Sequence, residues 1–118
     1  MTLSTGCYRL WRPDHGVPVR TSVGPPRWFP DVLVEWPTVY PWGIYNADLD
    51  EQTFRRKYRH QLHRKTPKVL AELQELREGY ASLGIVLLCF EPAGTFCHRT
   101  VLAGWLEEQL GETISELS

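Results

Sequence analysis

The chain has 118 residues, of which 42% are hydrophobic and 23% are charged. These proportions are typical of a globular protein, and they exclude a disordered or fibrous one. A chain of this length has room for one hydrophobic core, so we predict a single domain over residues 1–118. The formal net charge of -1 argues against a strongly cationic binder. No apolar run approaches the roughly 20 residues that cross a bilayer, which predicts no membrane partner.

Cysteine usage favours a cytoplasmic protein. The three cysteines are an odd number, and the N-terminal residues lack the pattern of a secretory signal. In a reducing compartment thiols stay free, so we expect no disulfide between Cys7, Cys89 and Cys97.

The first half of the chain predicts short strands. Apolar and polar side chains alternate over residues 17–23, a strand pattern that Gly24-Pro25-Pro26 ends. Residues 2–8 and 32–34 predict two further strands. The stretch 36–45 is rich in tryptophan, tyrosine and proline, and it predicts a loop because proline removes backbone donors. Its aromatic rings either cover the core or offer stacking platforms for unpaired bases.

Two helices are predicted next. An apolar side chain recurs at every fourth position from Phe54 to Leu62, behind a capping aspartate at position 48 or 50. Thr66 as an N-cap, followed by Pro67 at the first helical position, indicates the start of a second helix, which has a wider apolar stripe. Between residues 52 and 68 the chain carries many lysines and arginines and no acid, so this region forms a basic surface.

The last part of the chain predicts the centre of the sheet. The continuous apolar run 84–90 is typical of a strand that is covered on both faces. Thr95 is expected to cap a final helix that Gly111 ends, and residues 112–117 predict a short edge strand. Because strands and helices alternate, we predict an α/β fold with a mostly parallel sheet, helices on its faces and three layers.

Open parallel sheets bind ligands at the carboxyl ends of their strands. The candidate catalytic residues follow the predicted central strand: Glu91, Cys97 and His98. A cysteine near a helix N-terminus, with a histidine and an arginine beside it, has the surroundings that lower a thiol pKa. Glu91 is suited to act as an acid or a base, or to orient Arg99. A structural alternative leaves Cys97 packed beneath the loop.

Other strand ends supply candidate binding residues, namely Ser22, Arg27, Trp28 and Arg99. Arginine is the side chain best suited to grip a phosphate or a carboxylate. We expect Cys7, Tyr8 and Cys89 to lie behind them as supporting residues. For Cys89 the favoured interpretation is a small core side chain, because free cysteine is often buried.

Two motifs resemble a known family. Cys89 and Glu91 form a Cys-x-Glu, and Cys97-His98-Arg99 follows at the next helix; together they resemble the hallmark of the family of unknown function 488 (DUF488), found in bacteria, archaea and their phages. The segment 22–30 is similar to the second-strand loop of a short subgroup. Longer members often carry a lysine and an aspartate after the glutamate, where this chain has Pro92 and Ala93. The resemblance implies a fold and a site but no reaction.

Two functions are consistent with the sequence. The first is an enzyme, or an anion binder, for a phosphate-bearing small molecule or nucleotide. Glycine-rich phosphate motifs are absent from the sequence, and we predict no cofactor. We also predict no metal, because Cys-x-x-Cys spacing is missing and adjacent ligands on a helix diverge.

The second function is a non-catalytic module that binds nucleic acid or a protein through the basic helix 55–68. Its candidate contacts are Arg55, Arg56, Lys57, Arg59 and Arg64. The structural alternative is a solvated helix face, which the near-neutral total charge favours.

Overall fold

The computed structural model describes residues 3–24, 28–29, 33–44, 49–90 and 97–117. Its sheet has five strands in the order β3-β2-β4-β1-β5, and every pairing is parallel. The strands are β1 (Leu3–Cys7), β2 (Val17–Arg20), β3 (Val34–Glu35), β4 (Ile85–Cys89) and β5 (Ser115–Glu116). The apolar strand β4 lies at the centre, and all five of its residues are buried, as its sequence predicts.

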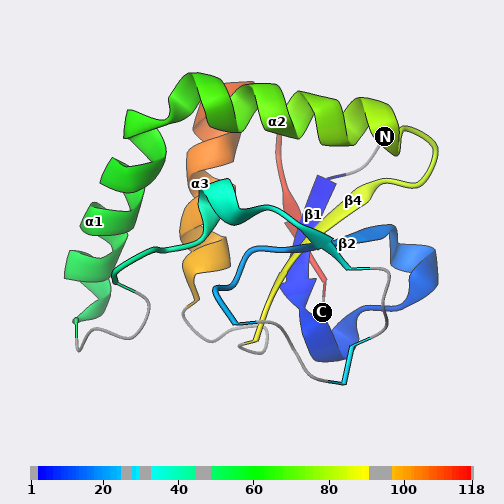
Figure 1. Cartoon of the computed structure of the whole chain (residues 1–118), viewed down its shortest axis with the longest axis horizontal. Coiled ribbons are helices and arrows are strands. Elements are labelled where there is room, and N and C mark those ends of the chain that lie inside the picture. Colours follow the sequence, from blue (N-terminus) through cyan, green and yellow to red (C-terminus); the bar gives the residue numbers. More distant parts are fainter. Residues whose placement is uncertain (1–2, 25–27, 30–32, 45–48, 91–96, 118) are drawn as a thin grey trace.

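Three α-helices lie in the connections from β3 to β4 and from β4 to β5, as crossovers between parallel strands require. They are α1 (Glu51–Arg64), α2 (Thr66–Gly79) and α3 (His98–Leu110), and Figure 1 shows α3 lying between α1 and the sheet. The side chain of Asp50 accepts a hydrogen bond from the backbone N–H of Thr53, which confirms the predicted cap of α1. Gly111 ends α3 in the left-handed conformation, as predicted.

Side chains of β4 alternate between two apolar clusters. Ile85 and Leu87 join the main core together with residues of all three α-helices. Val86 and Leu88 point to the other face, where they pack with Tyr8 of the 3-10 helix η1 (Tyr8–Leu10). The α/β fold with a three-layer order is therefore confirmed, and in the described part of the chain the thinner layer is built from η1 and loop residues. Two further 3-10 helices are η2 (Pro13–His15) and η3 (Pro37–Val39).

Two helix starts differ from the prediction. The N-cap of α2 is Lys65, and the Thr66 hydroxyl instead donates to the carbonyl of His63. Helix α3 begins at His98, with Cys97 as its extended N-cap residue. Thr95, the predicted cap, lies outside the described residues. None of the helices that the structure describes is long and apolar enough to span a membrane.

Candidate functional site

Three strand ends bring the central residues of the site together. The β1–β4 register places Cys7 directly beside Cys89. On the other side of β4, the backbone N–H of Thr21 donates to the carbonyl of Leu88 over 3.1 Å, which continues the β2–β4 pairing past the end of β2. Cys7, Cys89 and Thr21 thus lie along one edge of the sheet, the carboxyl edge where ligands of open parallel sheets bind.

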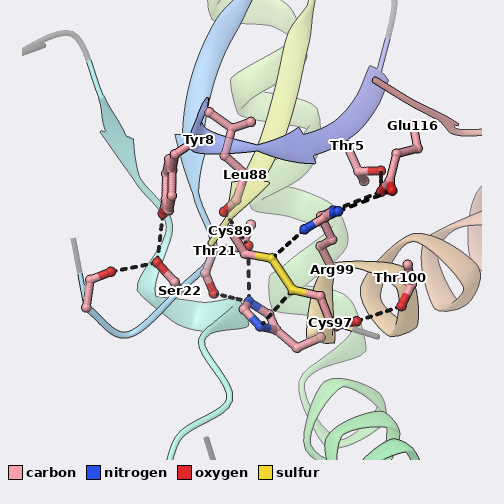
Figure 2. The surroundings of a disulfide bond; sticks show 12 residues. Thr5, Tyr8, Thr21, Ser22, Leu88, Cys89, Cys97, Arg99, Thr100 and Glu116 are labelled. Carbon is pink, nitrogen blue, oxygen red and sulfur yellow. Dashed lines mark hydrogen bonds and ion pairs between the residues drawn. A yellow bond between two sulfur atoms is a disulfide. The ribbon is translucent and has the colours of Figure 1, made fainter. Parts of the chain in front are cut away.

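A disulfide joins Cys89 to Cys97 and ties the end of β4 to the start of α3 (Figure 2). The free thiols that we expected at these two positions are absent from this structure. Among the described residues Cys7 carries the one free thiol, and it is buried. Cys89 is therefore more than a core side chain beside the site, because it is the covalent partner of Cys97.

His98 bridges the disulfide and the end of β2. Its Nε2 lies 2.8 Å from the backbone oxygen of Thr21, and its Nδ1 lies 3.7 Å from Cys97 Sγ. Burial lowers the pKa of His98 to about 4, although the Thr21 carbonyl favours the protonated form. The imidazole is therefore neutral near pH 7. Since a carbonyl oxygen only accepts, Nε2 carries the proton and Nδ1 presents a lone pair toward the sulfur.

Arg99 is fully buried behind the disulfide. Its Nε and Nη2 donate to the carboxylate of Glu116 over 2.8 and 3.2 Å, and its Nη1 donates to Cys89 Sγ over 2.9 Å. This ion pair lowers the pKa of Glu116, to which Thr5 also donates. Figure 2 shows the guanidinium between the carboxylate and the sulfur pair. Such a cation stabilises negative charge on Cys89 once the disulfide is reduced.

Tyr8 and Ser22 form a separate polar pair. Their hydroxyl oxygens lie 2.7 Å apart, and Ser22 also donates to the carbonyl of Gly24. Burial raises the pKa of Tyr8 to about 12, so this phenol stays protonated at neutral pH. Figure 2 places the pair away from the disulfide, which leaves the predicted binding role of Ser22 a prediction.

Not every predicted site residue has a described position. Trp28 is 57% exposed and its ring lies near that of Phe29. Glu91 and Arg27 lie outside the described residues, so their predicted roles remain predictions. Of the predicted catalytic and supporting residues, the structure brings together Cys89, Cys97 and His98, and it places Cys7 beside Cys89 on the neighbouring strand.

This cluster has the composition of a metal site. Ligand atoms of Cys89, Cys97 and His98 all lie within 4.8 Å of one another. The interpretation that adjacent ligands diverge is therefore wrong for Cys97 and His98. Thiolate, however, is the form of cysteine that binds metals, and here the two sulfurs are bonded to each other. The absence of a metal remains our prediction for this form of the protein.

Thr21 and Glu116 contact the site residues His98 and Arg99 but are not among the residues predicted from the sequence. Thr21 falls at the end of a predicted strand, which is a position that places backbone and side chain at the ligand edge. Glu116 follows α3 in the edge strand, where an acid is ordinarily exposed. No sequence signal indicates that it pairs with Arg99 rather than with another charge.

A comparison of the sequence with family models agrees with the two motifs. The model described as the active DUF488-N3 subclade matches residues 9–110. The chain belongs to this DUF488 family. Its match includes both disulfide cysteines, His98 and Arg99, whereas Cys7 and Glu116 lie outside the matched region. No curated protein and no solved structure matches the chain.

Proposed function

We propose that this DUF488 protein is a thiol-dependent enzyme in which Cys97 is the nucleophile and His98 its proton acceptor. The observation that carries the proposal is the fixed orientation of His98. The Thr21 carbonyl holds Nε2–H, which leaves the Nδ1 lone pair 3.7 Å from Cys97 Sγ. A nucleophile beside a base that is itself oriented by a third group is the general arrangement for covalent catalysis.

The disulfide is the resting, oxidised form of this site. Its activation is a two-electron reduction by a cellular dithiol, which becomes a disulfide while Cys89 and Cys97 become thiols. On this basis we propose that the protein is cytoplasmic and of bacterial or phage origin, because reductants of the cytoplasm keep Cys89 and Cys97 as thiols. Arg99 then favours the thiolate form of Cys89, to which its Nη1 already donates.

In the reduced form His98 acts during the attack rather than before it. In the disulfide form burial lowers the pKa of His98 to about 4, so the imidazole is neutral near pH 7 and its Nδ1 is able to accept the thiol proton. As the Cys97 sulfur donates an electron pair to the electrophilic atom of the substrate, Nδ1 takes the thiol proton. The leaving group departs with the electrons of the broken bond and receives that proton from His98.

A phosphate-bearing small molecule or nucleotide is the substrate class that we favour. Cys97 is the N-cap residue of α3, and the N-terminal N–H groups and dipole of a helix attract anions. We assign Glu91 the role of a second acid or base, and Arg27, Trp28 and Ser22 the role of orienting the substrate. Arg99, which is fully buried, acts from behind through its hydrogen bond to Cys89 Sγ rather than by contact with the substrate. The description of the matching subclade as active supports a catalytic function.

The test is site-resolved alkylation with iodoacetamide. We expect the disulfide form to react slowly, and the reduced form to react fastest at Cys97. His98→Gln keeps an N–H that can reach the Thr21 carbonyl but removes the Nδ1 lone pair, so it should slow this reaction about 10- to 100-fold near pH 7. His60→Gln, at an exposed position of α1, is the matched control.

Inorganic phosphate and a nucleoside monophosphate are added to the alkylation experiment to test the proposed substrate class. We expect either anion to protect Cys97 of the reduced protein from alkylation while Cys7 is unaffected. Equal alkylation rates at Cys89 and Cys97, or a His98→Gln variant that reacts as fast as the His60→Gln control, would refute the nucleophile. If neither inorganic phosphate nor the nucleoside monophosphate protects Cys97 from alkylation, the phosphate-bearing substrate class is excluded.

A further inference from the structure

Helix α1 borders three adjoining hollows on a surface separate from the disulfide. The first, of about 660 Å³, is lined by α1 residues and by Trp105 of α3. The second, of about 470 Å³, shares Arg56 and His60 with the first. The third, of about 330 Å³, shares Gln61 and Arg64 with the second and adds Trp42. Because neighbouring hollows share residues, they adjoin one another along α1, and we call the three together the α1 track.

The α1 track is basic along its whole length. No acidic side chain among the described residues lines any of the three hollows. Arg55 and Arg59 make ion pairs with Glu51 and Glu108 at exposed sites, where such pairs are weak and a ligand phosphate competes with them. Lys65, which lines the third hollow, is half-buried and donates to the carbonyl of Thr38 over 2.8 Å. The other cations of the track are exposed and make no ion pair with a described residue: Arg56, Lys57 and Arg64.

Two buried polar atoms on this track lack a partner in the described part of the chain. They are the indole Nε1 of Trp105, which lines the first hollow, and Oε1 of Gln61, which lines the second and third. A buried polar group without a hydrogen bond is costly, and such groups are few in native proteins. Both atoms belong to residues that line the track, so among the described residues polar groups stay unpaired directly beside it.

Trp42 gives the track an aromatic end. Its side chain is 50% exposed, whereas the neighbouring Trp36 and Tyr40 are only 3% exposed and cover the core. Its Nε1 donates to the carbonyl of Pro37 over 2.9 Å, and Gln61 donates to its backbone oxygen. The indole is therefore held in place with much of its surface open. A fixed exposed ring beside cations is the combination on which unpaired bases stack.

We propose that the α1 track binds single-stranded nucleic acid. Arg56, Lys57 and Arg64 contact phosphates, and Trp42 stacks on an unpaired base. A duplex fits this arrangement poorly, because its bases are already stacked and only its phosphates would engage the track. An acidic protein segment would satisfy the charges but would leave the Trp42 surface without a stacked ring. The proposal stands apart from the thiol chemistry, since none of these residues touches the disulfide.

Fluorescence anisotropy with a labelled 12-nucleotide single strand tests the proposal over a range of salt concentrations. We expect affinity to fall with salt, with a slope of about -0.7 per phosphate neutralised. The triple variant Arg56→Ala, Lys57→Ala, Arg64→Ala should flatten that slope by about 2. The matched control removes three exposed cations that line none of the hollows: Arg9→Ala, Arg12→Ala, Lys68→Ala.

Trp42→Ala distinguishes a nucleic-acid site from a general polyanion site. We expect it to weaken single-strand binding roughly 5- to 150-fold, the value of one base stacked on an aromatic ring, while binding of inorganic polyphosphate stays unchanged. Circular dichroism verifies that each variant is folded. Equal affinity for the single strand, a duplex of the same length and polyphosphate would overturn the proposal. So would the absence of salt-sensitive binding by the unmodified protein.

Discussion

Nε2 of His98 lies 2.8 Å from the backbone oxygen of Thr21, a residue 77 positions earlier in the chain. A main-chain carbonyl cannot donate a proton or rotate away from its strand, so it determines which imidazole nitrogen carries hydrogen. The backbone just after β2 therefore determines that His98, the first residue of α3, presents an unprotonated Nδ1 to the sulfur of Cys97. This long-range contact links the fold directly to the candidate site.

The buried, neutral state of His98 predicts loss of stability in mild acid. Its folded pKa of about 4 lies below the ordinary histidine pKa of 6.5, so the unfolded chain binds more protons between these two values. The free energy of unfolding should therefore decrease as the pH falls from 6.5 to 4, by about 3 kcal/mol in total. Urea titrations at pH 7, 6 and 5 measure this slope while most carboxyl groups stay ionised.

A non-titrating side chain at position 98 provides the comparison. His98→Gln should lose most of the pH dependence between pH 7 and 5, because glutamine binds no proton in this range. His60→Gln, at an exposed position, should retain it. An unchanged slope in His98→Gln would show that another group is responsible for the acid sensitivity.

The buried ion pair between Arg99 and Glu116 should contribute far more to stability than an exposed pair. Glu116→Gln removes the carboxylate charge that pairs with the fully buried guanidinium, and we expect it to lower the free energy of unfolding by roughly 3 kcal/mol. Glu112→Gln breaks the more exposed pair with Arg77 and should cost about 0 to 1 kcal/mol. Chemical denaturation of both variants measures the difference. Equal losses would mean that Arg99 finds another partner.

Much of the fold follows from side-chain periodicity. The uninterrupted apolar run of β4 predicts a strand covered on both faces, and Ile85 and Leu87 indeed pack against one cluster while Val86 and Leu88 pack against the other. A parallel sheet follows from the alternation of strands and helices, since hairpin turns are missing. These features are predictable because they depend on local pattern alone.

The pairing within the site was less predictable, because it depends on the backbone at one residue. We expected Cys97 within the first helical turn, where its side chain would diverge from that of His98. Its backbone is instead extended, with φ -149° and ψ 152°. As the N-cap residue it connects to Cys89 while His98 contacts its sulfur. Likewise, Glu116 pairs with Arg99 because β5 adds to β1 at the sheet edge, a register that the sequence does not encode locally.

Replacing glycine by alanine should have opposite effects on stability at two positions of the chain. Gly16 has a φ of 126°, and a Cβ there would lie 2.9 Å from the backbone oxygen of Leu83. Gly16→Ala should therefore destabilise the protein by more than about 1 kcal/mol. Gly104 lies inside α3 with open space around its Cβ position, so Gly104→Ala should stabilise by roughly 0.5 to 1 kcal/mol. Thermal unfolding measures the stability of both variants. A stabilising Gly16→Ala would contradict the backbone conformation of Gly16, which directly precedes β2.

The Cys89–Cys97 disulfide predicts a stability that depends on reductant. The cysteines are eight residues apart, and closing a loop of this size restricts the unfolded chain by about 2.5 kcal/mol. Adding a phosphine reductant should lower the free energy of unfolding by about that amount in the natural sequence. It should have no effect on Cys97→Ser, which cannot form the bond, whereas Cys7→Ser should respond like the unmodified protein.

Thiol titration of the denatured, unreduced protein should find one thiol per chain, that of Cys7, and three after reduction. Three thiols before reduction, together with a stability that ignores the reductant, would show that the site is a dithiol at rest and that no reductive activation precedes its chemistry.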